Sequence, residues 1–464
     1  MAVSVVLAGA GHTHVELLRR GEAFRRAGYR LTVINPAPTH PYSGMGPGVL
    51  GGDYRYEDIL LPVADLARRA HAEFLQDRVV GIDAAARTLR LQQSGLLRYD
   101  LLSLNLGSEV AGREPSYGAS SAGTLFYGAF SAGDRSHGAS SPGNRGFGDR
   151  GFARPTGTLY PAKPIESLYA ARQEIERRVC AERDCRVAVV GGGPASVELA
   201  ANAAALLTRL GHGQTPRGCA VDLFVAAEPA AYRMHNSPDG GRAVHRPHGA
   251  ASAGLAGLSG RRERLVAATL QRRGVQLRVG PPVDPDALAT DSGYAIVLVA
   301  TGVRPPAVLR TSGLPLDSSG AVRVDRYLRA DGFPNVFAVG DCASFPVAGR
   351  VRRTLPGETP GTERTLTRAG VFAVRQQKTL LRNLLVSAER ISMRLPTFTS
   401  ADGGQAEQTP LCPFTGTGDH LSALNLGLRF GIAYRGRWSL AGKLAYRLKD
   451  WIDRSFVRRY QHVR

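Results

Sequence analysis

The chain has 464 residues, 43% of them apolar, and a formal net charge of +20 that comes almost entirely from arginine. This length is enough for two or three domains, and so basic a chain favours anionic partners. Five cysteines are too few for a disulfide scaffold and none forms a Cys-x-x-Cys pair, so we expect free thiols and no metal site. The lack of a signal peptide and of any run of about 18 apolar residues predicts a cytoplasmic protein.

Most of the chain alternates short apolar runs with helical patterns, which is typical of parallel α/β architecture. Two units begin in the same way, with a buried strand that ends in glycine and leads into a helix. The first unit has a strand over residues 3–9 and a helix over 15–26, and the second a strand over 187–191 and a helix over 197–210. The pattern therefore predicts two Rossmann-like units.

The first strand leads into a loop with Gly9 and Gly11, where His14 replaces the usual third glycine. A dinucleotide needs a tight turn, a glycine where the backbone meets the phosphates, and a helix N-terminus directed at the anion. We expect His12 and His14 to lie beside the phosphates, with catalytic bases as the alternative. The second strand ends at Asn35 instead of the usual acidic residue, so its hold on a ribose should be weaker.

Three segments, 111–157, 232–262 and 400–419, are rich in glycine and polar residues. In the first, glycine recurs at every fifth position from Gly118 to Gly148. Such segments cannot bury enough apolar surface to offset their ordering entropy, so we expect disordered or flexible inserts. Few aromatic residues interrupt the repeat, so we do not expect nucleic-acid binding.

The second glycine loop contains Gly191 and Gly193, with the small Ser196 at the third position. It again follows a strand and opens a helix, which favours a dinucleotide site. The next strand ends at Ala226 instead of an acidic residue. Three interpretations remain: the loop accepts NADP, binds NAD weakly, or is vestigial.

Two later strands complete the pattern. The strand over 297–300 ends in Thr301-Gly302, and another ends in Gly340-Asp341. With the two glycine loops, these motifs resemble the pyridine nucleotide-disulfide oxidoreductase superfamily. The resemblance implies a bound FAD, places all four residues at the cofactors, and gives Asp341 a hydrogen bond to the flavin ribityl chain.

Within this superfamily the chain is similar to type II NADH:quinone dehydrogenases, and more closely to the flavoprotein module associated with selenide, water dikinase. This likeness is carried by residues 11–14, 41–48, 368–376 and 449–454. It implies that NADH or NADPH delivers hydride to the flavin and that a quinone, or another small acceptor, takes the electrons. It also implies catalytic roles for Glu198 beside the nicotinamide and for Gln376 and Gln377 near the quinone, with Ser43 at the cofactor.

The implied fold class is α/β, with two Rossmann-like domains of three layers around parallel sheets and a small α+β C-terminal region. The FAD-binding domain would comprise 1–165 and 316–395, and the NAD(P)-binding domain 166–315. The C-terminal region would be 396–464, with an amphipathic helix over 439–460.

We expect the C-terminal helix to follow a strand over 426–434. One stripe of the helix carries Leu440, Leu444, Leu448, Trp451, Ile452, Ser455 and Phe456, and basic residues flank it. Such a helix suits an anionic bilayer, its own domain, or the partner in a homodimer. The resemblance favours peripheral attachment to the inner face of the cell membrane.

Three alternatives are weighed against this function. A sulfide:quinone oxidoreductase-like enzyme needs a cysteine pair at the flavin, and a thioredoxin-reductase-like enzyme needs Cys-x-x-Cys; the sequence offers neither. A flavin-binding accessory or regulatory protein of selenium metabolism, with little turnover, is favoured by the missing acids at Asn35 and Ala226.

Overall fold

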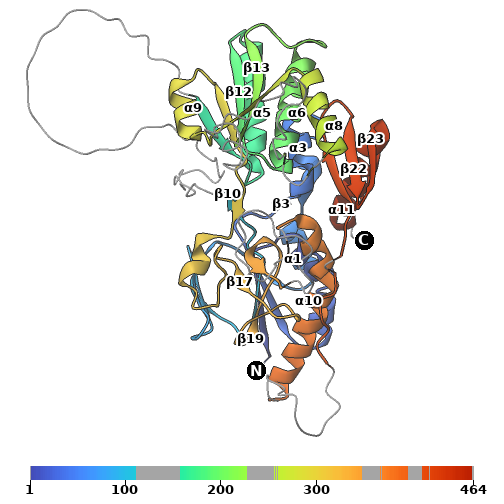
Figure 1. Cartoon of the computed structure of the whole chain (residues 1–464). Helices are drawn as coiled ribbons and strands as arrows, with labels where there is room; N and C mark the ends of the chain where they lie inside the picture. Colours follow the sequence, from blue (N-terminus) through green and yellow to red (C-terminus); the bar gives the residue numbers. More distant parts are fainter. Residues whose placement is uncertain are drawn as a thin grey trace, which may run out of the picture.

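The computed structural model describes residues 2–110, 157–226, 255, 258, 260–346, 366, 368–394, 410–416 and 418–461. The predicted inserts at 111–157, 232–262 and 400–419 lie largely outside these residues. Two parallel sheets form separate units, above and below a narrow connection, and the C-terminal region lies beside both (Figure 1).

The first unit is built on a six-stranded sheet. In spatial order its strands are β18 (Arg329–Ala330), β19 (Phe333–Ala338), β9 (Leu101–Leu104), β1 (Ser4–Ala8), β2 (Arg30–Asn35) and β5 (Glu73–Gln76). All neighbours are parallel except β18 and β19. Every residue of β1 and β9 is buried, as expected for continuous apolar strands at the centre of a parallel sheet.

Several helices and short strands complete this unit. Its helices are α1 (His12–Arg19), α2 (Glu22–Arg26), α4 (Val63–Arg69) and α10 (Gly370–Ser392), with 3₁₀ turns η1 (Ser43–Met45), η2 (Glu57–Ile59), η3 (Ala307–Thr311) and η4 (Gly340–Cys342). Helix α3 (Gly46–Leu50), which follows η1, packs instead against helices of the second unit. The smaller sheets pair β3 (His40–Pro41) with β4 (Leu60–Leu61), β17 (Val322–Arg323) with β20 (Ala343–Ser344), and β6 (Val79–Asp83) with β7 (Thr88–Leu91) and β8 (Gly95–Arg98). Helix α1 packs between α10 and α4.

The second unit has five strands, all parallel. Their order is β11 (Thr158–Pro161), β15 (Ile296–Val299), β12 (Cys185–Val190), β13 (Cys219–Ala226) and β14 (Val275–Gly280). Its helices are α5 (Glu166–Cys180), α6 (Pro194–Leu210), α8 (Arg261–Arg272) and α9 (Pro285–Asp291). The antiparallel pair β10 (Glu109–Val110) and β16 (Val303–Arg304) lies where the two units meet (Figure 1).

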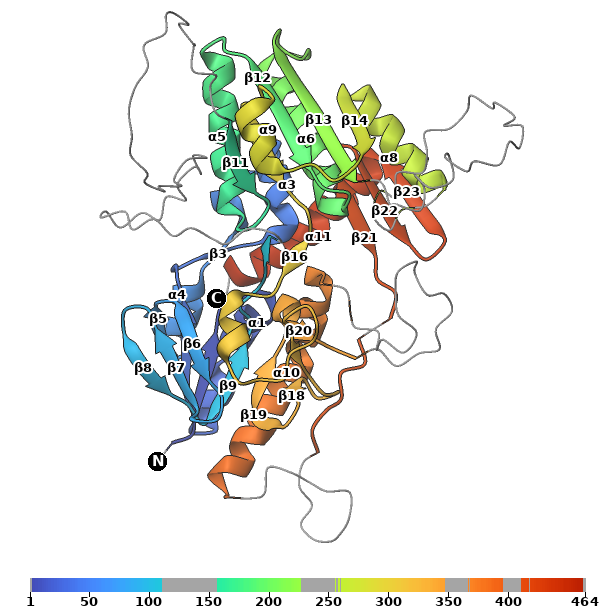
Figure 2. The ribbon, with the colours of Figure 1, turned by 60° about the vertical axis from the view of Figure 1, so that its left-hand side comes forward.

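The C-terminal region is a three-stranded antiparallel sheet followed by a long helix. Its elements are β21 (Ser422–Asn425), β22 (Gly431–Arg435), β23 (Trp438–Gly442) and α11 (Lys443–Gln461). Helix α11 runs between the two larger units (Figure 2), packing on β22 and contacting β4 and α1. The predicted class, α/β with two Rossmann-like units and a small C-terminal α+β region, is confirmed.

Several predicted boundaries are wrong for local reasons. The helix predicted over 15–26 is two helices, because the chain turns at Gly21, where an added Cβ would lie 2.4 Å from the Cβ of Ala70. The strand predicted over 426–434 is interrupted by a turn in which Gly427, Leu428 and Arg429 have positive φ.

The C-terminal helix also differs from its prediction. It begins at Lys443 instead of residue 439, because residues 438–442 pair with β22 as strand β23. The predicted apolar stripe is not its packed side, since Leu444, Trp451 and Ile452 are exposed. The buried side instead consists of Ala445, Lys449, Asp453, Phe456, Val457 and Tyr460.

Candidate functional site

The first glycine turn, residues 9–14, depends on close packing against the end of β9. Gly9 has φ +81°, and a Cβ there would lie 2.5 Å from the backbone oxygen of Asn105. A Cβ at Gly11 would lie 2.5 Å from Asn105 Oδ1. Both positions therefore require glycine, because no side chain fits between the turn and the neighbouring strand end.

Asn105 ties this turn to two other segments. Its Oδ1 accepts hydrogen bonds from Thr13 N (3.2 Å) and His14 N (3.4 Å), and its Nδ2 donates to the carbonyl of Val339 (3.1 Å). Within the described part of the chain, the N–H groups of Gly11 and His12 have no hydrogen-bond partner. Two backbone donors at the start of α1 thus remain available to an anion.

His14 and Asn35 hold the turn from inside. His14 is fully buried, with Nδ1 2.6 Å from the carbonyl of Gly9 and Nε2 2.8 Å from Ser103 Oγ. Burial lowers the pKa of His14 to about 4, so the ring is neutral, with Nδ1–H donating to the carbonyl. Asn35 accepts from Ala10 N (3.2 Å) and donates to a nearby carbonyl, so its amide joins β2 to the turn.

Asp341 lies beside the turn in η4, directly after β19. Its Oδ2 accepts hydrogen bonds from Ser108 Oγ (2.7 Å) and Lys163 Nζ (2.6 Å). Burial alone would raise the pKa of Asp341, but Lys163 and Ser108 outweigh it and keep the pKa below its ordinary value. The carboxylate is therefore ionised, and its Oδ1 has no partner among the described residues.

His12 lies close to Asp341 in an aromatic cluster. Its ring is 5.9 Å from His40, 5.2 Å from Tyr42 and 5.8 Å from Phe456, measured between centroids. Burial lowers the pKa of His12 to about 4 and that of His40 to about 3, so both rings are neutral. Among the described residues, nothing hydrogen-bonds the buried Nε2 of His12. This atom is a buried polar group that a bound ligand could satisfy.

Gln376 and Gln377 lie in the second turn of α10, and both are buried. The oxygen of Gln376 accepts from Gly340 N (2.9 Å), in the turn that carries Asp341. Gln377 donates to the carbonyl of His12 (2.7 Å) and to the hydroxyl of Tyr460 (3.2 Å). Both side chains thus hold the turns of the first unit, and their contact with a quinone stays a prediction.

The second glycine turn, residues 191–196, is more open. A Cβ at Gly191 would lie 2.3 Å from the carbonyl oxygen of Ala300, whereas a Cβ at Gly193 would meet nothing within 4 Å. Ser196 is buried and donates to the carbonyl of Gly193 (2.7 Å). Gly302, with φ +110°, follows the exposed Thr301 at the end of β15, next to this turn in the sheet order.

Glu198 lies one turn into α6 and faces the C-terminal region. Its Oε1 accepts from Asn425 N (2.6 Å), and burial raises the pKa of Glu198 to about 7. Lys449 and Asp453 of α11 act on it electrostatically, and they form a buried ion pair of 2.7 Å. Lys449 also donates to the carbonyl of Gly44 (2.7 Å), so α6, α11 and the loop after β3 meet at this point.

Ser43 begins η1, between two residues that contact α11. Tyr42 donates to Asp453 (3.2 Å), and the carbonyl of Gly44 accepts from Lys449. Tyr42 also packs against His12 of the first glycine turn, so Ser43 lies between that turn and α11, and its contact with a cofactor stays a prediction.

Sequence reasoning missed Asn105, Ser108 and the two ionised residues of α11. A usable signal existed for Asn105, because a polar residue that ends a buried strand beside β1 must lie at the same sheet edge as the glycine turn. The sequence leaves two interpretations of Lys163, an approach to the flavin and, more favoured, a surface loop residue; the structure places it against Asp341. No local pattern indicated Lys449 and Asp453, whose burial depends on the docking of α11.

Comparison with known proteins adds a family and a fold. Residues 160–365 match the family described as pyridine nucleotide-disulphide oxidoreductase. A stretch of 101 residues is 32% identical to the mitochondrial internal alternative NAD(P)H-ubiquinone oxidoreductase A1 of Arabidopsis thaliana. That match covers 20% of each protein, so the chain spans about a fifth of the relative's length.

Solved structures match over nearly the whole chain. NDH2 from Plasmodium falciparum, in complex with NADH, has a TM-score of 0.62 at 12% identity and is matched over 100% of this chain and 99% of its own. The sulfide:quinone oxidoreductase of Aquifex aeolicus has a TM-score of 0.59 at 15% identity, over 99% and 92%.

These matches show the fold: the chain shares the two-unit architecture of these solved structures. The family match over residues 160–365 agrees with the resemblance that the motifs indicated. None of the helices in the described part of the chain is both long and apolar enough to cross a bilayer.

Proposed function

We propose that this protein is an FAD-dependent oxidoreductase that takes hydride from NADH or NADPH and passes the electrons to a quinone or another small acceptor. The observation that carries the proposal is the first glycine turn, where two unpartnered backbone amides start α1 and the ionised Asp341 lies beside them. Backbone amides at a helix N-terminus bind phosphates, and a carboxylate accepts hydrogen bonds from the hydroxyls of a polyol. A dinucleotide site has both kinds of group close together at the ends of parallel strands.

The residues of the first unit fit a flavin dinucleotide. The amides of Gly11 and His12 would donate to its diphosphate, and Asp341 Oδ1 would accept from a ribityl hydroxyl. Lys163 keeps the Asp341 carboxylate ionised and fixes its orientation. When bound, the flavin supplies the chemistry of hydride acceptance and electron transfer.

The second glycine turn would hold the nicotinamide dinucleotide. Gly193 leaves open space where phosphates must approach, and Ser196 keeps its hydroxyl on the turn's own carbonyl. Strand β13 ends at Ala226 without a carboxylate for the ribose. This ending is compatible with either NADH or NADPH.

Glu198 is the candidate proton-holding group. Its pKa of about 7 allows the carboxyl oxygens to carry a proton at neutral pH, and the neighbouring Lys449 and Asp453 compensate changes in its charge. Glu198 is therefore assigned to proton transfer during acceptor reduction.

The test is an anaerobic titration of the purified protein. Bound flavin should colour it yellow, NADH or NADPH should bleach the flavin band, and a soluble quinone should restore it. Asp341→Asn should lower flavin content by about tenfold or more, because an amide is a weaker acceptor than a carboxylate. Asp65→Asn, which changes an exposed carboxylate of α4, is the control and should keep full flavin content. A colourless wild-type protein would contradict the proposal.

A second candidate is an accessory flavoprotein of selenium metabolism with little turnover. It is favoured by Asn35, whose amide is engaged within the fold instead of offering a carboxylate to a ribose. Yellow colour without bleaching by either nicotinamide would support it. A sulfide:quinone oxidoreductase-like enzyme is less favoured, because all five cysteines are free and burial raises the pKa of Cys342, next to Asp341, to about 11.

We also infer that the C-terminal region rests on the inner face of an anionic membrane. Of the nine large apolar side chains that are exposed in the described part of the chain, five lie between residues 428 and 452, so exposure is concentrated there. Trp438 and Trp451 suit an interfacial position, and nearby arginines would attract acidic lipids. The same side of α11 could instead join two copies in a homodimer, which sedimentation in detergent-free buffer would reveal.

We propose the domains with their predicted bounds: 1–165 with 316–395 for FAD, 166–315 for the nicotinamide, and 396–464 for membrane contact. Strand β11, at 158–161, departs from this division because it pairs with β15 in the second sheet.

A further inference from the structure

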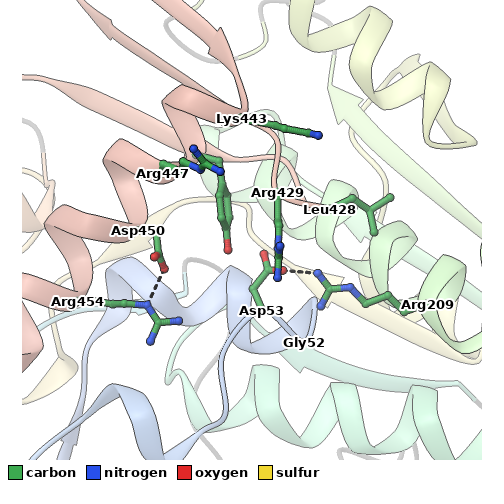
Figure 3. A pocket seen from close by; sticks show the side chains of 10 residues that line it. Gly52, Asp53, Arg209, Leu428, Arg429, Lys443, Arg447, Asp450 and Arg454 are labelled. Carbon is green, nitrogen blue, oxygen red and sulfur yellow. Dashed lines mark hydrogen bonds and ion pairs between the residues drawn. The ribbon is translucent and has the colours of Figure 1, made fainter.

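A basic cavity of about 680 Å³ lies beside the C-terminal helix, away from both glycine turns. Its wall is made by residues that follow α3, by the end of α6, by the turn between β21 and β22, and by the first half of α11 (Figure 3). The positive end of the α11 dipole is close to it, because Lys443 is the first residue of that helix. Four segments of the chain thus form one concave wall.

The lining of this cavity carries more positive than negative charge. Arg209 is paired with Asp53, and Arg454 with Asp450 at 2.9 Å, as the dashed lines in Figure 3 mark. Those two aspartates are the only acidic residues of the lining. The remaining basic residues carry the excess charge.

Arg429, Lys443 and Arg447 are these remaining basic residues. None of the three makes an ion pair or side-chain hydrogen bond with another described residue. Arg429 is held at the cavity by the tight turn in which its own φ is +58°. Arg273 stabilises this turn by donating a hydrogen bond to the carbonyl of Gly427 (2.7 Å). Three cationic side chains therefore line the cavity without a carboxylate partner, because both aspartates of the lining are paired with other arginines.

Exposed apolar side chains lie at the cavity and on the neighbouring surface of α11. Leu428, which lines the cavity, is 38% exposed, and Leu444, next to Lys443, is 64% exposed. Trp451 is 68% exposed and lies one helical turn after Arg447, so both side chains share one side of α11. A soluble anion would gain nothing from these apolar groups, whereas a lipid offers them the boundary between headgroups and acyl chains.

We propose that this cavity binds the phosphate headgroup of an anionic phospholipid, with Arg429, Lys443 and Arg447 as its ligands. The neighbouring Leu428, Leu444 and Trp451 then enter the interfacial layer of the bilayer. This site rests on the membrane contact of the proposed function and gives it a specific attachment point. It is independent of the dinucleotide sites, because none of its three ligands contacts a glycine turn.

The experiment uses the full-length protein with its flavin and two kinds of vesicle. One kind is phosphatidylcholine alone, and the other also contains phosphatidylglycerol. The pocket variant Arg429→Gln/Lys443→Gln/Arg447→Gln is compared with Arg69→Gln/Arg90→Gln/Arg98→Gln. The comparison variant loses the same charge from exposed positions on α4, β7 and β8 of the first unit.

Co-sedimentation should show wild-type protein on the vesicles that contain phosphatidylglycerol and little on phosphatidylcholine alone. The pocket variant should bind the acidic vesicles about tenfold or more weakly, whereas the comparison variant should lose about twofold or less. Equal losses in the two variants would mean diffuse charge attraction and would overturn the site. Saturable calorimetric binding of inorganic phosphate to a protein that does not sediment with vesicles would assign the cavity to a soluble phosphate instead.

Bleaching of the flavin by NADH in the same preparations, without vesicles, separates the two proposals. Bleaching without vesicle binding would refute the lipid site and leave the oxidoreductase intact. Vesicle binding that depends on the pocket, in a protein that NADH does not bleach, would support the lipid site and refute the dehydrogenase.

Discussion

The two glycine turns start alike and end differently. Gly9 and Gly191 both have positive φ and both lie against the carbonyl oxygen at the end of a neighbouring strand, that of Asn105 in one case and Ala300 in the other. At the next positions they diverge. The side chain of Asn105 fills the space at Gly11, whereas nothing lies within 4 Å of a Cβ at Gly193.

The same divergence affects two glutamates seven residues after the first glycine of each turn. Burial of Glu16 would raise its pKa, but hydrogen bonds from Arg19 and Arg20 outweigh this effect and lower it. Burial of Glu198 raises its pKa to about 7. Equivalent residues in equivalent motifs therefore have opposite electrostatics. Glu16 has two arginines one turn later in its own helix, whereas Glu198 is buried against β21 and α11.

The largest effect is expected from replacing Asn105, whose side chain packs against the first glycine turn and has no counterpart at the second. Asn105→Ala leaves the buried amides of Thr13 and His14 without partners, at about 1–3 kcal/mol each, and removes one of the two hydrogen bonds that the carbonyl of Val339 accepts. We expect the free energy of unfolding to fall by about 3 kcal/mol or more, with loss of flavin. Urea unfolding and absorbance would measure both. Normal flavin content and wild-type stability would show that the two turns do not differ in this way.

Titration of the two glutamates should change stability in opposite directions. The folded-state pKa of Glu198 is raised from 4.5 to about 7, so its ionisation costs the folded protein about 3 kcal/mol, at about 1.4 kcal/mol per pKa unit. Glu198→Gln should therefore gain stability over wild type as the pH rises from 4.5 to about 7. The folded-state pKa of Glu16 is lowered, so its contribution is present above 4.5 and is lost as the pH falls through the folded-state value.

Urea unfolding over this pH range, with Glu16→Gln as the matched variant, would measure the contrast. Glu16→Gln should be less stable than wild type at neutral pH and approach it in acid. Parallel profiles for the two variants would refute the opposite electrostatics.

Alanine at the second glycine sharpens the comparison at a smaller scale. Gly11→Ala forces a Cβ against the hydrogen-bonded amide of Asn105 and should cost about 1–3 kcal/mol, with weaker flavin binding. Gly193→Ala meets open space, so stability and flavin content should remain, while the KM for NADH rises because the methyl group occupies the approach to the phosphates. Thermal unfolding and steady-state kinetics would distinguish the two. Equal loss of stability in both variants would contradict the difference in packing.

The smallest effect is expected at the third position of the second turn. Ser196→Gly removes one hydroxyl that donates to the carbonyl of Gly193, which should cost about 1 kcal/mol without loss of flavin. A differential scanning measurement on the flavin-loaded protein would show the change. Loss of flavin would mean that the second turn supports the first unit directly.

The sequence predicted the turns themselves and little of what surrounds them. Gly9, Gly191 and the strand before Asp341 were recognisable, because a positive φ and a buried parallel strand leave local patterns of glycine and apolar residues. The contact of Lys163 with Asp341 joins residues 178 positions apart, and no local pattern encodes such a pair.

The packing of the C-terminal helix was likewise not predictable from local sequence. Its amphipathic composition was evident, but the apolar stripe did not reveal which side of the helix packs on the protein. The structure buries Lys449 and Asp453, which satisfy each other as an ion pair, and leaves Leu444 and Trp451 exposed.

The amino-acid sequence by itself determined two parallel α/β units, each with a glycine turn at the end of its first strand, because strand burial and backbone freedom are local properties. The tertiary structure alone decided which turn is filled by Asn105, which glutamate is neutralised by burial, and where unpaired arginines gather beside α11. Those outcomes depend on sheet order and helix docking, which bring together residues whose separation along the chain leaves no periodic signal.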